Sequence, residues 1–331
     1  MTGARGHRRP GAAATAAVLC AVTAAGLYGC SGSGPSEPRP TPTPTPAPTT
    51  PPAGTSPLTG LPARSGPVLA VKIDNVPPAR PHTGLTAADL VYVEQVESGQ
   101  TRLMAVYSAR TPELVGPVRS ARESDLALLR QFGRPVLAYS GAQSALTPLL
   151  KAAPLHLVSE GTTPGAFLRD PARSAPHNLY LRPARALAAA PDATHAKDIG
   201  FRFGAAPQGG EPVNSRTVSF PAVRYTFTWA PAAKAWHVAM DGRADGPLAP
   251  ATVVVQHITV RSSRFHDFLG AVSPYSVTTG SGTAEVLRDG RAYPARWSRP
   301  DADRGTAFTT PAGAPLNFAP GQVWVLLTGT R

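Results

Sequence analysis

The sequence predicts an α+β protein in which an α/β layered N-terminal domain is followed by a β-rich C-terminal domain. In the first half, short runs rich in β-branched residues alternate with segments of helical periodicity, a pattern typical of layered α/β structures. After the glycine- and proline-rich stretch 204–212, only strand-like runs remain, separated by turn signals. We therefore expect an N-terminal domain over residues 57–204 and a C-terminal domain over residues 205–331.

The N-terminal domain is expected to alternate strands with helices. Its strands are predicted at residues 68–73, 90–94, 102–108 and 135–139. Its helices are predicted at residues 125–132, 143–151 and 182–190. Ser124 and Asp125 are the candidate N-caps of the first helix, because such side chains accept a hydrogen bond from an unpaired N–H at a helix start.

The C-terminal domain is expected to consist of strands and turns. Its strands are predicted at residues 225–229, 235–240, 252–260, 283–287, 291–297 and 322–328. Asp241-Gly242 and Asp289-Gly290 stand between strand-like runs, and Asp-Gly is a strong signal for a two-residue hairpin turn. Gly280-Ser281-Gly282 is expected to form a further turn.

Residues 1–29 have the features of a signal peptide. Three arginines in the first nine residues are followed by an apolar, uncharged stretch over residues 11–29. This stretch ends in Leu27-Tyr28-Gly29-Cys30, which resembles the lipobox of bacterial lipoproteins and predicts a diacylglyceryl group on Cys30. A transmembrane anchor is the alternative, but a segment dominated by alanine and glycine partitions weakly into a bilayer. We expect a lipid-anchored protein on the extracytoplasmic face of the cell membrane.

Residues 30–56 are expected to be the lipidated cysteine and a stalk. Proline, threonine, serine and glycine dominate this stretch. Such a composition cannot build a core and favours extended polyproline II structure, with a rise of ~3.1 Å per residue. We therefore expect the globular body to stand off the membrane surface.

The net charge limits the expected partners, and the two cysteines limit the expected disulfides and metal sites. The formal charge is +12, and arginine supplies nearly all of the excess. A basic exported protein suits anionic lipid headgroups or anionic wall polymers, although a GC-rich coding bias explains the arginines equally well. Nucleic acid is not an expected partner outside the cell. Cys20 falls in the signal peptide and Cys30 is the expected lipid site, so no disulfide or cysteine-bound metal is expected.

The candidate functional residues gather at the ends of predicted strands. Asp74, Glu94 and Glu97 are the candidate catalytic carboxylates. Arg119, Ser120 and Arg122 lie between a Gly-Pro turn and a helix start, where guanidinium groups and backbone N–H groups bind phosphate or carboxylate. The alternative is that both arginines pair with the carboxylates and stabilise the loops.

His177 is a candidate general base, and its neighbours Asn178 and Arg173 are candidate ligand-binding residues. A loop histidine that bonds a neighbouring backbone group is the commoner arrangement. No G-x-S-x-G, H-E-x-x-H, P-loop or dinucleotide motif occurs in the sequence, so we expect no metal and no cofactor. The four tryptophans fit either a sugar-stacking face or a core.

Several strings of residues resemble the YerB-like bacterial lipoproteins, a two-domain family of largely unknown function. In the first half they are Pro57-Leu58-Thr59-Gly60, Val71-Lys72-Ile73-Asp74-Asn75, Ala79-Arg80-Pro81, Thr101-Arg102, Gly116-Pro117-Val118-Arg119-Ser120-Ala121-Arg122 and His177-Asn178-Leu179-Tyr180. In the second half they are Gly280-Ser281-Gly282, Asp289-Gly290, Trp297 and Pro320-Gly321-Gln322-Val323-Trp324. The resemblance adds Arg80 and Arg102 to the candidate ligand-binding residues, and it implies a membrane-anchored protein but no reaction.

Three functions fit these observations. The first is a non-enzymatic lipoprotein that binds a cell-wall component or modulates a wall-synthesis protein. The second is a hydrolase or transferase acting on a wall polymer, with Asp74, Glu94 or Glu97 as acid or base and Arg119 and Arg122 holding the anion. The third is an extracellular solute-binding lipoprotein. We favour the first, because no complete catalytic set is visible.

Overall fold

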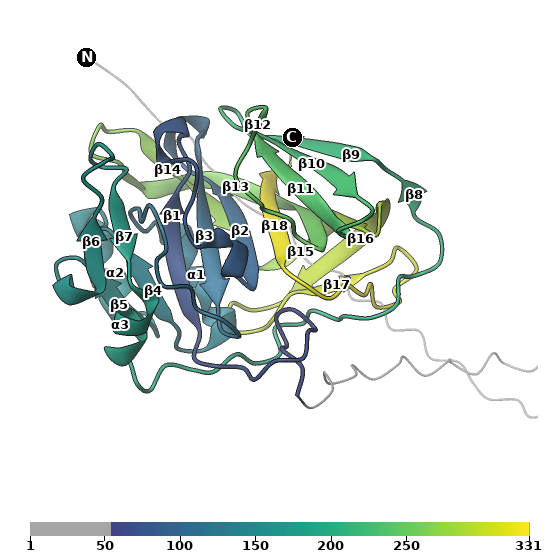
Figure 1. Cartoon of the computed structure of the whole chain (residues 1–331), viewed down its shortest axis with the longest axis horizontal. Helices are drawn as coiled ribbons and strands as arrows, with labels where there is room; N and C mark the ends of the chain where they lie inside the picture. Colours follow the sequence, from purple (N-terminus) through teal and green to yellow (C-terminus); the bar gives the residue numbers. More distant parts are fainter. Residues whose placement is uncertain (1–53, 331) are drawn as a thin grey trace, which may run out of the picture. The chain divides into compact units, whose positions relative to one another are not determined.

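The computed structural model describes residues 54–330. The predicted signal peptide, the predicted lipidation site Cys30 and most of the predicted stalk lie outside the described residues. These residues lie in one compact unit, in which strands far outnumber helices (Figure 1).

The strands of the first half are β1 (Leu69–Asp74), β2 (Leu90–Gln95), β3 (Thr101–Tyr107), β4 (Val136–Tyr139), β5 (His156–Ser159), β6 (Phe167–Arg169) and β7 (Leu179–Leu181). Those of the second half are β8 (Glu211–Pro212), β9 (Ser215–Ser219), β10 (Arg224–Ala230), β11 (Ala235–Met240), β12 (Arg243–Ala244), β13 (Thr252–His266), β14 (Val272–Val277), β15 (Gly280–Arg288), β16 (Arg291–Arg299), β17 (Ala307–Thr309) and β18 (Val323–Gly329). The α-helices are α1 (Glu123–Leu129), α2 (Thr147–Ala152) and α3 (Pro183–Ala188). Single-turn 3-10 helices lie at Pro77–Ala79, Leu85–Ala87, Glu97–Gly99, Arg130–Phe132, Ser144–Leu146 and Pro164–Ala166.

One sheet of twelve strands contains strands from both halves of the chain. Its order is β17-β16-β15-β13-β18-β2-β3-β1-β4-β5, with β14 paired to β13 and β8 paired to β16. β18 runs parallel to β2, with Val325 opposite Tyr92, and it runs parallel to β13 on its other side (Figure 1). Backbone hydrogen bonds therefore join the two predicted domains, and the boundary between residues 204 and 205 stays a prediction.

The two faces of this sheet pack into separate cores, because successive residues of a strand point to opposite faces. On one face, Val71 of β1 packs in a cluster with Tyr225 of the four-stranded sheet β12-β11-β10-β9. On the other face, Ala70 packs in a cluster with Leu128 of α1. Lys72 belongs to the same alternate set as Ala70, so the polar end of β1 lies on the α1 side.

The predicted strands and helices are all present, with shifted ends. The largest shift is in β13, which runs to His266 instead of ending at residue 260. Several short strands, among them β5, β6, β7, β9, β14 and β17, were not predicted. The mixture of many strands with few helices agrees with an α+β protein, whereas the α/β layering of the first half stays a prediction.

The start of α1 differs from the prediction. Arg122 is the N-cap residue, and neither Ser124 nor Asp125 occupies that position. Asp125 lies one turn further along, where its Oδ2 accepts a hydrogen bond from the backbone N–H of Arg122 at 2.7 Å. The carboxylate satisfies a backbone donor just before the helix from its third position, as in a capping box. This contact thus holds Arg122 at the helix start.

Three glycine-containing strings in the second half were predicted to be turns, and two of them are hairpin turns. Asp241-Gly242 and Asp289-Gly290 have positive φ at both residues and connect β11 to β12 and β15 to β16, which confirms both predicted hairpin turns. The turn predicted at Gly280-Ser281-Gly282 is wrong, because these residues open β15. A Cβ on Gly282 would lie 2.7 Å from Nε1 of Trp297, so this glycine makes room for the indole across the strand pair.

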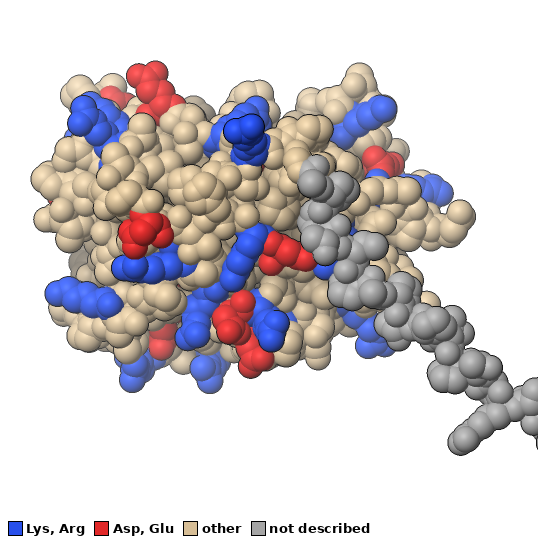
Figure 2. Space-filling view, turned by 90° about the horizontal axis from the view of Figure 1, so that it is seen from below, with Lys and Arg blue, Asp and Glu red and all other residues tan. Residues whose placement is uncertain are grey.

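Charged side chains are spread over the surface. On the face seen in Figure 2, arginine and lysine side chains stand beside aspartate and glutamate side chains in several places. The formal excess of positive charge therefore does not form one broad basic face there, and any basic site must be sought in a cleft.

Candidate functional site

A cleft of about 470 Å³ lies where the loop before α1 meets the end of the β13–β14 hairpin. Arginines from two segments line it: Arg102 from the start of β3, and Arg119 and Arg122 from the loop before α1. Ser120 lies between the last two. The lining also includes Gln143, His266, Asp267 and Phe268. We call this the arginine cleft.

Arg122 is held by a buried carboxylate. Its Nε lies 2.5 Å from Oε1 of Glu97 and its Nη2 lies 2.8 Å from Oε2, a bidentate pair. The hydroxyl of Ser273 on β14 also donates to Oε1 of Glu97. Burial by itself raises the pKa of Glu97, but the hydrogen bonds from Arg122 and Ser273 outweigh it and hold that pKa at about 2. Glu97 thus links the loop before α1 to the hairpin.

Arg119 is held by Asp74 in the same way, although less closely. Its Nε lies 3.3 Å from Oδ2 of Asp74, which is only 2% exposed at the end of β1. Nδ1 of His177 lies 2.8 Å from the same oxygen. Because a carboxylate oxygen accepts, this distance fits an Nδ1–H donor and leaves Nε2 of a neutral His177 as an acceptor.

Arg102 differs from its two neighbours. Its Nη1 donates to the backbone oxygen of Ser120 at 2.8 Å, but no carboxylate of residues 54–330 forms an ion pair with it. Burial and the nearby charges of Arg122 and Arg119 together lower the pKa of Arg102 to about 9, against the opposing effect of Glu97 and Asp74. A buried guanidinium without a counterion favours the arrival of an anion.

Glu94 is not part of the arginine cleft. It pairs with Lys72 at 3.0 Å, and Lys72 also contacts Asp125 at 2.7 Å; all three side chains are buried. Burial, only partly offset by Lys72 and reinforced by the charge of Asp125, raises the pKa of Glu94 to about 7. The three candidate carboxylates therefore sit in three separate ion pairs, and none of them lines the cleft.

The remaining predicted ligand-binding residues lie elsewhere in the chain. Arg80 donates to the backbone oxygen of Asn75 and to Asp241. Arg173 donates to the backbone oxygen of Pro81, and Asn178 accepts from Arg169. None of these three residues lines the cleft, and their role in ligand binding stays a prediction.

Sequence reasoning missed the hairpin side of the cleft. His266, Asp267 and Phe268 were overlooked because β13 was expected to end at residue 260. The sequence signal there is weak, because Phe265 is the one large apolar residue between Val260 and Asp267, although in the structure buried Ser263 and Phe265 alternate with exposed neighbours. Gln143 was placed in a helix but not in a site.

The tryptophans do not form a sugar-stacking face. Trp236 and Trp324 are fully buried, Trp297 is 3% exposed, and Trp229 packs against the core. Among residues 54–330, no helix is long and apolar enough to cross a membrane. In the same range, no cluster of three or more His, Cys, Asp or Glu side chains is arranged to hold a metal ion.

Comparison with known proteins gives a family without an activity. Residues 58–197 match the N-terminal domain, and residues 216–325 the C-terminal domain, of a protein family of unknown function, DUF3048. A curated relative, "Putative lipoprotein YerB" of Bacillus subtilis (strain 168), is 35% identical over 130 residues, which cover 38% of this chain and 39% of the relative. The match thus spans well under half of that protein's length.

The fold is also similar to a solved structure. The crystal structure of the YerB protein from Bacillus subtilis superposes with a TM-score of 0.71 and 23% sequence identity. The superposition covers 83% of this chain and 96% of the other. At this identity the likeness concerns the fold alone.

Proposed function

Because the chain belongs to the DUF3048 family, whose molecular activity is unknown, we propose a function from its own site: it is a non-enzymatic binding protein of the cell envelope that holds an anionic group of a wall component in the arginine cleft. As part of this proposal, Cys30 carries the lipid that anchors the protein to the extracytoplasmic face of the cell membrane. A relative named as a lipoprotein supports the anchor.

The observation that carries the proposal is the contrast among the three arginines. Asp74 and Glu97 orient Arg119 and Arg122, so little side-chain entropy is lost when these two meet a ligand. Arg102 supplies the positive charge that no carboxylate of the described residues pairs with. A phosphate or carboxylate in the cleft would meet oriented donors and one unpaired cation, which is the chemistry of an anion site.

A hydrolase is the second candidate, and one contact favours it. Asp74 orients His177 through Nδ1, which leaves Nε2 for a general base. In this reading Arg119, bonded to the same carboxylate, holds the anionic part of the polymer.

Binding to purified cell-wall sacculi tests the proposal. The protein carries Cys30→Ala, so that no lipid contributes to retention. Sacculi with their anionic polymers intact are compared with sacculi from which these polymers have been extracted. We expect Arg102→Gln to weaken retention on intact sacculi about tenfold, because a charge-assisted hydrogen bond contributes about 1.5–3 kcal/mol. Arg296→Gln, an exposed arginine on β16, is the matched control and should bind as the parent does.

The outcomes separate the candidates. Equal retention of Arg102→Gln and the parent would contradict an anion site in the cleft. Release of soluble fragments that is lost in His177→Ala would replace the binding function with the hydrolase. In cells, Cys30→Ala should abolish lipid labelling of the protein, and unchanged labelling would contradict Cys30 as the anchor.

A further inference from the structure

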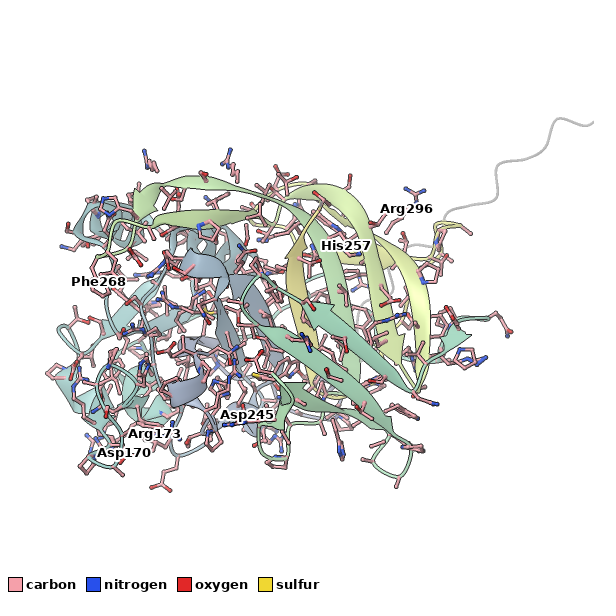
Figure 3. The ribbon with its side chains drawn as sticks, turned by 90° about the horizontal axis from the view of Figure 1, so that it is seen from above. Asp170, Arg173, Asp245, His257, Phe268 and Arg296 are labelled. Atoms are coloured by element: carbon pink, nitrogen blue, oxygen red, sulfur yellow. The ribbon has the colours of Figure 1, made fainter. Side chains whose placement is uncertain are left out.

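The end of the β13–β14 hairpin exposes apolar side chains beside the arginine cleft. Phe268 is 89% exposed, Leu269 is 77% exposed and Val272 is 57% exposed. Among the described residues, the other exposed large apolar side chain is Leu61, at 41%. Figure 3 shows Phe268 at the edge of the molecule, far from Arg296. We call Phe268, Leu269 and Val272 the hairpin tip.

The backbone of the hairpin tip is closed on itself. Oδ1 of Asp267 accepts hydrogen bonds from the backbone N–H groups of Leu269 and Ala271, both at 2.9 Å. The N–H of Asp267 donates to the oxygen of Ala271, and the N–H of Gly270 donates to the oxygen of Asp267. These four backbone donors are paired within the turn, which lowers the cost of moving it out of water.

Two arginines stand behind the tip on β13. Arg261 lies over the ring of Tyr275 at 4.7 Å and Arg264 over the ring of Phe265 at 5.1 Å. Both are exposed, and no carboxylate of residues 54–330 pairs with either. At a strand rise of ~3.3 Å per residue, Arg264 lies at most about 13 Å back from Phe268 along the chain, and Arg261 at most about 23 Å. A long arginine side chain spans several ångströms, so the guanidinium of Arg264 is placed to reach the headgroup region when the apolar end enters the boundary of a bilayer.

We propose that the hairpin tip docks on a bilayer of anionic phospholipids, with Phe268 and Leu269 entering the boundary of the hydrocarbon, Arg264 reaching the headgroup phosphates and Arg261 adding positive charge further back on the strand. The charge of the two unpaired arginines selects an anionic surface over a neutral one. The hairpin tip adjoins the arginine cleft, so docking places the cleft at the membrane surface. This inference concerns where the body sits, and it does not depend on what the cleft binds.

Co-sedimentation with vesicles tests the inference, using residues 54–331, which lie in one compact unit, so that neither a lipid on Cys30 nor the apolar stretch over residues 11–29 can bind. The vesicles are phosphatidylcholine alone or phosphatidylcholine with phosphatidylglycerol. We expect binding to the anionic vesicles and at least tenfold weaker binding by the double variant Phe268→Ser, Leu269→Ser. Leu61→Ser is the matched control for an exposed apolar residue and should bind as the parent does.

The charge and the depth are tested separately. Arg261→Gln with Arg264→Gln should weaken binding to anionic vesicles while Arg296→Gln does not. Phe268→Trp should gain fluorescence that brominated acyl chains quench. All the changes are on exposed residues, so a thermal melt like that of the parent is expected for each variant.

Four results would overturn the inference. They are no binding of the parent to anionic vesicles, equal binding of the double serine variant, no quenching of Phe268→Trp, and a dimer in solution that the double serine variant abolishes, which would assign the hairpin tip to a second copy of the chain. Arg102→Gln should leave vesicle binding unchanged while it weakens binding to sacculi, so the failure of one proposal is distinguishable from the failure of the other.

Discussion

Neighbouring acidic residues in this protein have opposite environments. Glu97 accepts from Arg122 and Ser273, and although burial alone raises its pKa, these contacts hold the pKa at about 2. Glu94 is buried beside Lys72 and Asp125, and burial raises its pKa to about 7. A carboxyl three residues further along the chain thus responds to pH in the opposite direction, because one has a dedicated hydrogen-bonding cation and the other shares its cation with a second carboxylate.

The Glu97 contacts predict a loss of stability in acid. A folded pKa of about 2 against an unfolded value of 4.5 means that the contribution of Glu97 is complete above pH 4.5 and is lost as pH falls toward 2. We expect Glu97→Gln to lower the free energy of unfolding at pH 6 by up to about 3 kcal/mol and to flatten its decline below pH 4.5. Urea unfolding between pH 6 and pH 2.5 measures this; parallel curves for parent and variant would contradict it.

Glu94 has the opposite effect on the pH dependence of stability. Because its folded pKa is raised, the stability that its protonated form contributes is lost as pH rises from about 4.5 to about 7.

At the scale of the element, hairpin turns connect several strands of the second half. The turns at Asp241-Gly242 and Asp289-Gly290 share the same sequence signal and positive φ values, but their surroundings differ. A Cβ added to Gly242 would meet nothing within 4 Å, whereas one added to Gly290 would lie 2.8 Å from Trp229. Both dipeptides therefore form a hairpin turn, but at Gly290 the absence of a Cβ also leaves room for the ring of Trp229.

This difference is measurable with a pair of alanine variants. Gly242→Ala should cost about 1 kcal/mol, because alanine resists positive φ. Gly290→Ala should cost about 2–4 kcal/mol, because it adds a clash with Trp229 to the same backbone strain. Denaturant unfolding at neutral pH compares the two, and equal losses would show that the indole yields freely.

At the scale of the whole molecule, one twelve-stranded sheet contains strands from both halves of the chain. β18 is hydrogen-bonded between β2 of the first half and β13 of the second. Trp324 on β18 packs in one cluster with Val91 of β2 and Phe227 of β10. Strands and side chains thus join regions that two separate family models match.

Such a continuous core predicts cooperative unfolding. We expect a single calorimetric transition for the protein, with the calorimetric enthalpy equal to the van't Hoff enthalpy, because exposing the edge of β2 would also expose the shared cluster. Trp324→Ala should shift that transition downward as one peak, by about 3–5 kcal/mol of stability. Two separated peaks would instead show that the halves unfold independently.

Much of the local structure could be predicted from the sequence. Short strand-like runs of mainly apolar residues located strands such as 68–73 and 235–240, and Asp-Gly dipeptides located both hairpin turns, because these signals act between residues close in the chain. The sequence also placed Arg119, Ser120 and Arg122 at a helix start, where they line the cleft. The end of β13 was missed because its mixed polar residues alternate weakly.

Which residues meet was decided only by the tertiary structure. The sequence by itself determined that Asp74, Glu97, Arg102, Arg119 and Arg122 are charged residues at strand ends and loops. Only the register of β1, β2 and β3, with the hairpin from the other half laid across them, decided that two of the arginines are paired and Arg102 is not. Charge pairing falls off within a few ångströms, whereas the residues concerned are separated by tens of positions, so no local pattern carries that information.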